Sequence, residues 1–346
     1  MKPFEPQRFI ETVEAALKKK NIHGIVLQIA SKDDTISLTH AAGNLQPNSR
    51  YYIASINKLI ISALVLRLID QNRLSFEDRL IDFVEKDMQN GLHVIDGIDR
   101  TGEITILHML SQTSGLPCYL SDKPKNQPSA MDELIAGIDR PWPIEEIITR
   151  VRQLPAHFVP GRPNKAKYID TNHQFLSLVI EKIEQHSIKD IIQDVFEELK
   201  MSDSHVCTDV HDTSYVFPFY KDDVRDIRNY TVSTHTDIIS TCADQMRFIK
   251  AFMAGHFWPK DKLHELESFN KIFFPFKYGI GIQQFYTPRI FSPLKPLPDM
   301  IGHCGSTGSV MFYVKHLNLY FCGTTNQQSN PSAMFQTIMK ILYQLI

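Results

Sequence analysis

Hydrophobic periodicity predicts a helix and then a strand hairpin at the start of the chain. Over residues 6–20, apolar side chains recur every three or four positions, as on one face of an amphipathic helix. The run 24–30 is apolar almost throughout and predicts a buried strand. A turn at Asp33 and Asp34 follows, and the alternation over 35–39 predicts the hairpin partner of that strand.

The C-terminal end carries a similar arrangement. Two apolar runs, 309–314 and 319–324, predict strands joined by a short connection, and the periodicity over 332–346 predicts a final helix. We expect the first and last strands of the chain to pair within one mixed sheet.

The middle of the chain has a mostly helical pattern. Residues 59–70 are apolar on nearly every side, which predicts a buried central helix. Further helices are predicted at 105–111, 144–151, 172–185 and 243–254. Segments rich in Pro, Gly or aromatic residues predict loops at 154–163, 215–220 and 273–281.

Together these elements predict an α/β fold of the α+β type. A mixed, largely antiparallel sheet would be flanked by helices and would carry an inserted helical domain. We expect residues 1–58 and 240–346 to form the sheet-plus-helix part and residues 59–239 the mainly helical part. The two parts would make one catalytic unit with the site at their junction.

The composition is that of an ordinary globular protein, with 43% hydrophobic and 22% charged residues. A net charge of -2 creates no strong field, so a nucleic-acid partner is not expected. The most apolar stretch, 59–69, is too short to span a membrane, and no secretory signal pattern is visible. The five cysteines form no Cys-x-x-Cys pair, which favours a reducing, cytoplasmic setting.

The first candidate for chemistry is the tetrad Ser55-Ile-Asn-Lys58, at the start of the predicted central helix. Residues three apart on a helix share a face, so the Lys58 nitrogen can reach the Ser55 hydroxyl. The helix N-terminus also offers free N–H groups to a forming oxyanion. We expect burial to lower the pKa of Lys58 so that it can act as a base. Taken alone, the tetrad is a weak signal, because Ser-x-x-Lys arises by chance in many proteins, and Ser55 as a helix cap with Lys58 on the surface is the favoured alternative.

A second candidate, Tyr168, lies between a Pro-Gly loop and a predicted helix. A tyrosine on such a loop can point into a cleft, and a phenolate stabilised by Lys58 could act as a general base. Simple packing of Tyr168, with Asp170 or Thr171 as a helix cap, is the alternative.

A third candidate is the glycine-rich segment Gly302–Ser309, which enters a predicted strand. Glycines such as Gly305 let a substrate approach the backbone closely. The strand edge could bind an acyl chain by strand addition and supply an N–H to an oxyanion hole. A plain turn between strands is the alternative.

In this order, the three segments resemble the motifs of the penicillin-recognising serine enzymes. In that family Ser-x-x-Lys precedes a Tyr-x-Asn-like element and a Lys/His-Thr-Gly-like element. The resemblance runs from Gly24 to Gln327 and is to class C β-lactamases, serine D-peptidases and family VIII-type esterases. It implies the β-lactamase/transpeptidase-like fold. Further similar segments are 104–117, 239–244, 278–281 and 323–326.

The resemblance implies a role for each candidate. Ser55 would be acylated, and Lys58 and Tyr168 would share the proton transfers. Backbone N–H groups of Ser55 and Ser306 would form the oxyanion hole. His303 would stand near the substrate carboxylate or the Tyr168 oxygen. The resemblance implies no metal or cofactor, and the expected partner is a small ester, amide or peptide.

Three departures from the family pattern bear on the substrate. Asp170 replaces an Asn, and an ionised carboxylate can only accept hydrogen bonds. His303 replaces a Lys and can be neutral at pH 7, and Cys304 replaces a Thr or Ser. All three changes weaken recognition of a β-lactam carboxylate. We therefore expect a serine hydrolase of esterase or D-amino-acid-peptidase type, which acts through an acyl-enzyme and is a weak β-lactamase at most.

Other functions stay open at this point. A penicillin-binding or sensing module would acylate without efficient turnover, and an acyltransferase would pass the acyl group to an alcohol or amine. Cys304 beside His303 suggests a thiol nucleophile, although the intact Ser-x-x-Lys already accounts for the site. The sequence leaves the oligomeric state open.

Overall fold

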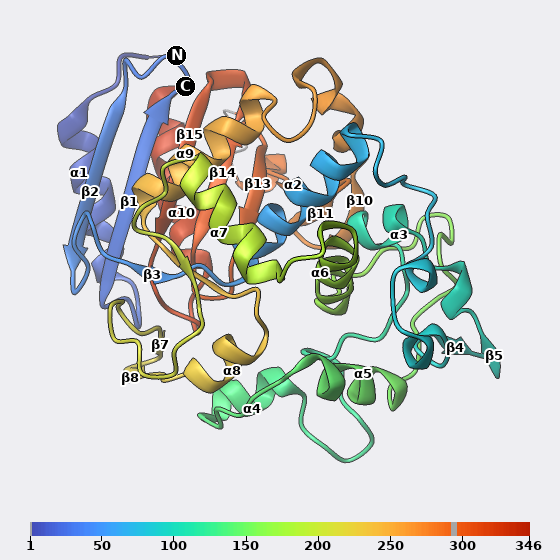
Figure 1. Cartoon of the computed structure of the whole chain (residues 1–346). Coiled ribbons are helices and arrows are strands. Elements are labelled where there is room, and N and C mark those ends of the chain that lie inside the picture. Colours follow the sequence, from blue (N-terminus) through green and yellow to red (C-terminus); the bar gives the residue numbers. More distant parts are fainter. Residues whose placement is uncertain (1, 292–295) are drawn as a thin grey trace.

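An eight-stranded antiparallel sheet forms the centre of the structure, a computed structural model that describes residues 2–291 and 296–346 (Figure 1). Its strands, in spatial order, are β10 (Asn270–Phe273), β11 (Phe276–Tyr278), β12 (Gln283–Phe285), β13 (Met300–Cys304), β14 (Val310–Val314), β15 (Leu319–Thr324), β1 (Gly24–Ser31) and β2 (Ser37–Gly43). Every neighbouring pair runs antiparallel, which confirms the largely antiparallel sheet that was expected.

The two ends of the chain meet in this sheet, as the pattern of strands predicts. β1 pairs with β15 in register from Val26 opposite Thr324 to Ser31 opposite Leu319. The termini lie together at one edge of the molecule, where Lys2 N donates to the Leu345 carbonyl (2.7 Å).

Helices cover both faces of the sheet. On one face, α1 (Pro6–Glu14) and α10 (Ser332–Leu345) pack against β1, so that Phe9, Leu27 and Ile338 share one core. On the other face lie α2 (Asn57–Asp70) and α9 (Cys242–Ala254). Because β1 is buried on both sides, its sequence is apolar almost throughout instead of alternating.

The remaining helices and strands lie mainly in the middle of the chain. The helices are α3 (Ile106–Leu110), α4 (Ala130–Ala136), α5 (Ile144–Arg152), α6 (Thr171–Glu184), α7 (Ile188–Glu198) and α8 (Arg228–Ser233). Small sheets are formed by β3 (Tyr51–Tyr52) with β9 (Ile238–Ser240) and β6 (His205–Val206), by β4 (Val94–Ile95) with β5 (Ile98–Asp99), and by β7 (Phe219–Tyr220) with β8 (Asp223–Val224). Within the two described ranges, no helix is both long and apolar enough to cross a bilayer.

Some element boundaries differ from the predicted ones for local reasons. β2 begins at Ser37 because the Asp33 carboxylate accepts from the N–H and the hydroxyl of Thr35 (3.3 and 2.9 Å) and holds that residue in the turn. The segment 273–281, predicted as a loop, contains β11, since its residues pair with β10 and β12 on either side. The predicted loop 215–220 likewise ends in β7.

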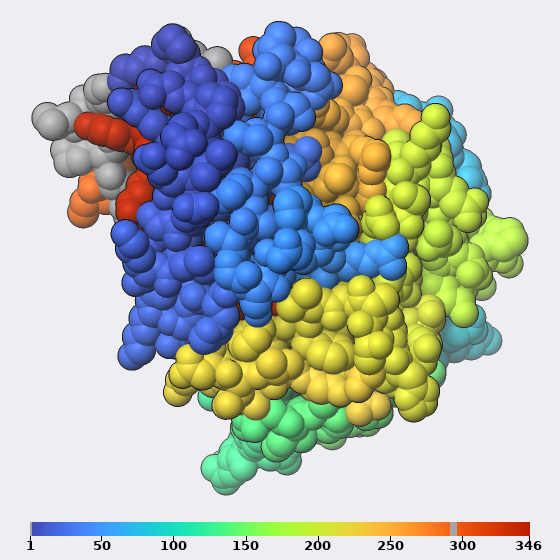
Figure 2. Space-filling view, turned by 90° about the vertical axis from the view of Figure 1, so that its left-hand side faces the viewer, coloured from blue at the N-terminus to red at the C-terminus, as the bar shows by residue number. Residues whose placement is uncertain are grey.

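A segment from the middle of the chain returns to the N-terminal part and positions the site. Figure 2 shows the residues around β7 and β8, in yellow, packed beside the N-terminal residues in blue. His23 Nε2 lies 2.9 Å from the Lys221 carbonyl, and Val216 N donates to the Arg50 carbonyl (2.9 Å). β9, which follows this segment, then pairs with β3, the strand that leads directly to Ser55.

Candidate active site

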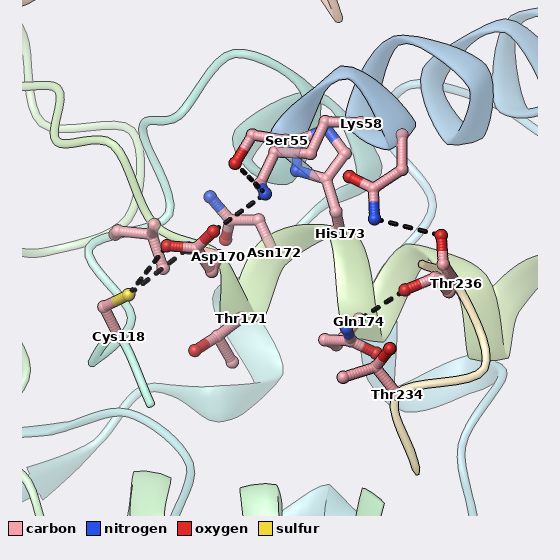
Figure 3. A network of polar contacts seen from close by, with 12 residues as sticks. Ser55, Lys58, Cys118, Asp170, Thr171, Asn172, His173, Gln174, Thr234 and Thr236 are labelled. Carbon is pink, nitrogen blue, oxygen red and sulfur yellow. Dashed lines mark hydrogen bonds and ion pairs between the residues drawn. The ribbon is translucent and has the colours of Figure 1, made fainter. Parts of the chain in front are cut away.

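Ser55 sits in a short 3-10 turn (Ala54–Ile56) that connects β3 to the buried helix α2. The preceding residue, Ala54, has φ +50°, a left-handed conformation that costs a non-glycine residue roughly 1–3 kcal/mol. Lys58 lies on the same face of the helix, and its Nζ donates to Ser55 Oγ at 3.0 Å (Figure 3). The structure therefore brings the two residues of the tetrad together.

The same lysine forms a buried ion pair. Lys58 Nζ lies 2.7 Å from Asp170 Oδ1, and the two side chains are only 8% and 11% exposed. Burial alone would lower the pKa of Lys58, but the charge of Asp170 and its hydrogen bond outweigh that effect and raise the pKa. The expectation that burial leaves Lys58 with a lowered pKa is therefore wrong, because it took no account of an anionic partner.

Residues of the loop 112–118 hold Asp170 in place. It precedes the first residue of α6, and Cys118 Sγ lies 3.4 Å from both its Oδ2 and its backbone N. Gln112 Oε1 accepts from Ile169 N (2.8 Å) and from Asn172 Nδ2 (2.9 Å), on either side of Asp170. These bonds orient the carboxylate toward Lys58 (Figure 3).

Tyr168 lies next to this pair. Its ring centroid is 5.5 Å from Lys58 Nζ. Burial, followed by the charge of Asp170, raises the pKa of Tyr168 well above its ordinary value, although the Ser55 hydrogen bond opposes this. The resting side chain is a neutral phenol, and the phenolate that the sequence suggested is not favoured here.

His303 does not reach the cavity. It is completely buried; its Nδ1 donates to the Cys304 carbonyl (2.9 Å) and its Nε2 accepts from the Tyr278 hydroxyl (3.2 Å). Burial and the nearby charge of Lys58 lower the pKa of His303 to about 3, so the ring is neutral. The expected contact of His303 with a substrate carboxylate is therefore corrected: this side chain packs behind Tyr168, at a ring distance of 6.1 Å.

The glycine-rich segment closes tightly over the turn that carries Ser55. Ser309 Oγ donates to the Ile53 carbonyl (2.7 Å), and a Cβ at Gly305 would lie 2.4 Å from that same oxygen. Only glycine fits there. Ser306 and Ser55 consequently line the same cavity, from two different parts of the chain.

A substrate cannot add to the edge of β13 as a further strand, because β12 occupies that edge. β12 already pairs with Gly302 and Ile301, and the Gln283 side chain accepts from Cys304 N (3.2 Å). The Cys304 thiol also donates to Gln283 (3.1 Å), and burial raises its pKa to about 12. A thiolate nucleophile at Cys304 is not supported.

The candidate residues surround a cavity of about 580 Å³. Ser55, Lys58, Tyr168 and Asp170 form its polar part, together with Cys304, Gly305 and Ser306. Much of the remaining wall is apolar and comes from the helical part on one side and the sheet part on the other: Leu120, Met131, Leu134, Ile227, Phe276, Phe285, Phe335 and Met339.

No sequence motif marks several of the polar groups in the wall. Gln174 Nε2 donates to Thr236 Oγ1 (3.2 Å; Figure 3), and Asn57 Nδ2 donates to the Thr236 carbonyl (3.0 Å). Asp237, the next residue along the chain, also lines the cavity. His173, on α6, is also buried in the wall. These residues belong to no recognisable motif, and only the packing of α2, α6 and β9 brings them together. Among the residues described, no three His, Cys, Asp or Glu side chains gather as they would around a metal ion.

Solved structures with this fold have low sequence identity to the chain. A D-stereospecific amidohydrolase from Streptomyces sp. matches with a TM-score of 0.78 and 18% identity, over 98% of this chain and 99% of that one. The hydrolase EstCE1, described as having promiscuous acyltransferase activity, matches with a TM-score of 0.76 and 16% identity, over 97% and 98%. An octameric penicillin-binding protein homologue from Pyrococcus abyssi matches with a TM-score of 0.74 and 18% identity, over 97% and 78%. These likenesses establish the β-lactamase/transpeptidase-like fold that the sequence suggested.

A sequence search of curated proteins found no match. The sequence model of the Beta-lactamase family matches residues 9–345, which is nearly the whole chain. Since the match includes the Ser55, Tyr168 and Gly302–Ser309 segments, the chain belongs to the Beta-lactamase family.

Proposed function

We propose that this protein is a serine hydrolase that cleaves an ester or amide through an acyl-enzyme on Ser55. The observation that carries the proposal is the 3.0 Å contact between Ser55 Oγ and Lys58 Nζ, beside a strained backbone turn in a 580 Å³ cavity. Membership of the Beta-lactamase family supports a serine hydrolase in general terms.

The protonation states of Lys58 and Tyr168 suggest how Ser55 is activated. Lys58 is charged and Tyr168 is neutral, so neither is a free base at rest. When a bound substrate displaces water from the cavity, Asp170 would take one proton from Lys58, which turns the ion pair into a neutral pair. The resulting amine can then take the Ser55 proton as Ser55 Oγ bonds to the acyl carbon. Asp170 thus acts in the proposed mechanism as the proton acceptor behind Lys58.

The later steps follow from the same groups. Backbone N–H groups of Ser55 and Ser306 would stabilise the oxyanion of the tetrahedral intermediate. Its collapse breaks the bond to the leaving group, which takes a proton from Lys58 directly or from Tyr168, which Lys58 then reprotonates. Asp170 returns its proton to Lys58, and the ion pair is restored. A water molecule then attacks the acyl-enzyme, releases the acid and returns the proton to Ser55.

Over residues 2–291 and 296–346, the cavity offers no free cation to the carboxylate of a β-lactam. His303 does not line the cavity. Among the described residues, Lys58 is the only charged basic side chain that lines it, and Lys58 is already paired with Asp170. We therefore propose esterase or D-amino-acid-peptidase-like activity, with β-lactamase activity weak at most. We also propose that the sheet-plus-helix part (1–58 and 240–346) and the helical part (59–239) form one catalytic unit around this cavity.

Covalent labelling tests the nucleophile directly. The protein is exposed to a fluorophosphonate, and the adduct is located by mass spectrometry of the intact chain and of its peptides. We expect one adduct on Ser55, none in Ser55→Ala, and full labelling in Ser332→Ala, which alters an exposed serine of the same cavity wall. Labelling that persists in folded Ser55→Ala would refute the assignment.

Turnover separates the remaining functions. Steady release of nitrophenol from an ester identifies an enzyme, whereas a single burst identifies a binding or sensing module that stalls after acylation. Product analysis with an added alcohol or amine separates an acyltransferase from a hydrolase, since both pass through the same acyl-enzyme.

A further inference from the structure

One carboxylate in the cavity wall has no part in the proposed acyl chemistry. Asp237, directly before β9, is only 4% exposed. Its Oδ1 accepts from the Tyr52 hydroxyl (2.7 Å) and from Asn57 Nδ2 (3.4 Å), and its Oδ2 accepts from the Thr234 hydroxyl (2.7 Å). These neutral donors hold the carboxylate in place without compensating its charge.

The charges around the cavity do not balance. Lys58 and Asp170 neutralise each other, and burial, followed by the charge of Lys58, keeps His173 neutral by holding its pKa well below the ordinary value. In the part of the chain that the structure describes, no basic side chain forms an ion pair with Asp237. Burial raises the pKa of Asp237 to about 6, although the hydrogen bonds of Thr234 and Tyr52 and the charge of Lys58 oppose this, so the carboxylate is mostly ionised at pH 7.5. A buried anion with no cation in contact is costly, and a bound cation would relieve that cost.

Aromatic rings surround this carboxylate. Tyr52, Tyr119 and Tyr230 line the same cavity, and the Tyr119 and Tyr230 hydroxyls are 3.1 Å apart. Burial raises the pKa of all three phenols, and the nearby charge of Asp237 raises each further. The three rings are therefore neutral at physiological pH, and neutral tyrosine rings attract cations.

We propose that Asp237, with Tyr52, Tyr119 and Tyr230, binds a cationic amine of the substrate. The ester or amide cleaved at Ser55 would then carry an ammonium group, as an aminoacyl derivative does. The apolar wall that includes Phe276 and Phe285 would accommodate the rest of the molecule. The identity of the substrate rests on the proposed function, but binding of the cation itself requires no acylation.

The test compares two small probes of similar shape, phenethylammonium and the neutral 2-phenylethanol. Their affinities are measured by titration calorimetry at pH 7.5 for the wild type, Asp237→Asn and Asp226→Asn. The control residue, Asp226, is already paired with Arg228 at 2.7 Å and does not line the cavity. We expect the wild type to prefer the cation by about tenfold or more, the scale of one charge-assisted hydrogen bond. Asp237→Asn should bind both probes about equally, and Asp226→Asn should match the wild type.

Equal binding of both probes by the wild type would overturn the proposal, as would an unchanged preference in folded Asp237→Asn. If Asp237→Asn does not fold, Tyr230→Leu is the second variant, and its preference for the cation should fall. Ser55 labelling is measured in parallel. Normal labelling without a cation preference rejects only the amine site, whereas a cation preference without labelling rejects only the acyl chemistry.

Discussion

Lys58 Nζ lies 2.7 Å from Asp170 Oδ1, so the lysine beside Ser55 is half of a buried ion pair. An Asn at position 170, the residue typical of the β-lactamases that the sequence resembles, would leave Lys58 without an anionic partner. The pair raises the pKa of Lys58, and in the proposed mechanism its carboxylate would receive the proton that Lys58 gives up before it activates Ser55.

Replacing Asp170 by Asn should make activity depend on deprotonation of Lys58. Without the carboxylate, burial lowers the pKa of Lys58, and the neutral amine forms when the solution removes the proton. We expect kcat/KM for a nitrophenyl ester to fall about a hundredfold at pH 6, where Lys58 stays protonated and no carboxylate receives its proton, and to recover as pH rises through the lowered pKa. The ratio of variant to wild-type kcat/KM between pH 6 and 10 is the measurement. An equal loss at every pH would show that Asp170 only positions other groups.

Tyr168→Phe should affect leaving groups unequally. The neutral phenol can donate a proton to a departing amine, whereas nitrophenolate needs no such help. We expect turnover of an anilide to slow by roughly a hundredfold or more, and that of a nitrophenyl ester to slow much less. The ring still packs near Phe273 and Tyr278, so the variant should keep its thermal unfolding midpoint. Equal slowing of both substrates would remove Tyr168 as the proton donor.

Gly305→Ala should damage the site because its Cβ would meet the Ile53 carbonyl at 2.4 Å and Ser309 Oγ at 2.3 Å. The glycine-rich segment must move away from the turn that carries Ser55. We expect kcat to fall and the free energy of unfolding to drop by about 1–3 kcal/mol, as for other overpacked sites. Gly102→Ala is the matched control, since its Cβ meets only Ile81 at 3.6 Å. Similar behaviour of the two variants would contradict the close fit.

His303 should make the protein sensitive to acid. Its pKa falls from 6.5 to about 3 on folding, so between these values the unfolded chain binds more protons than the folded protein does. The stability contributed by the neutral ring is complete above pH 6.5 and is lost toward pH 3, at up to about 1.4 kcal/mol per pH unit. In His303→Gln, the free energy of unfolding, measured with denaturant from pH 7 to pH 4, should fall less steeply with decreasing pH than in the wild type. Parallel slopes in the two proteins would show that His303 is not buried as a neutral ring.

The sequence by itself determined the features that depend on neighbours along the chain. The pairing of Ser55 with Lys58 follows from helical spacing, because residues three apart share one face wherever the helix lies. The buried central helix and the terminal strands follow from runs of apolar residues, since burial on all sides leaves no polar face. The amphipathic spacing of Ile188, Ile192 and Val195 after Ser187 carries the same kind of signal for α7, although no helix was predicted there.

Only the tertiary structure decided the electrostatics of the site. Lys58 lies on α2 and Asp170 lies directly before α6, and whether the pKa of Lys58 rises or falls depends on their contact as well as on burial. The same holds for His303, whose neutral state depends on burial and on the charge of Lys58, and for Asp237, which no motif marks. Charge interactions act through space and change sharply with distance and burial, so residue types and their spacing could not supply them.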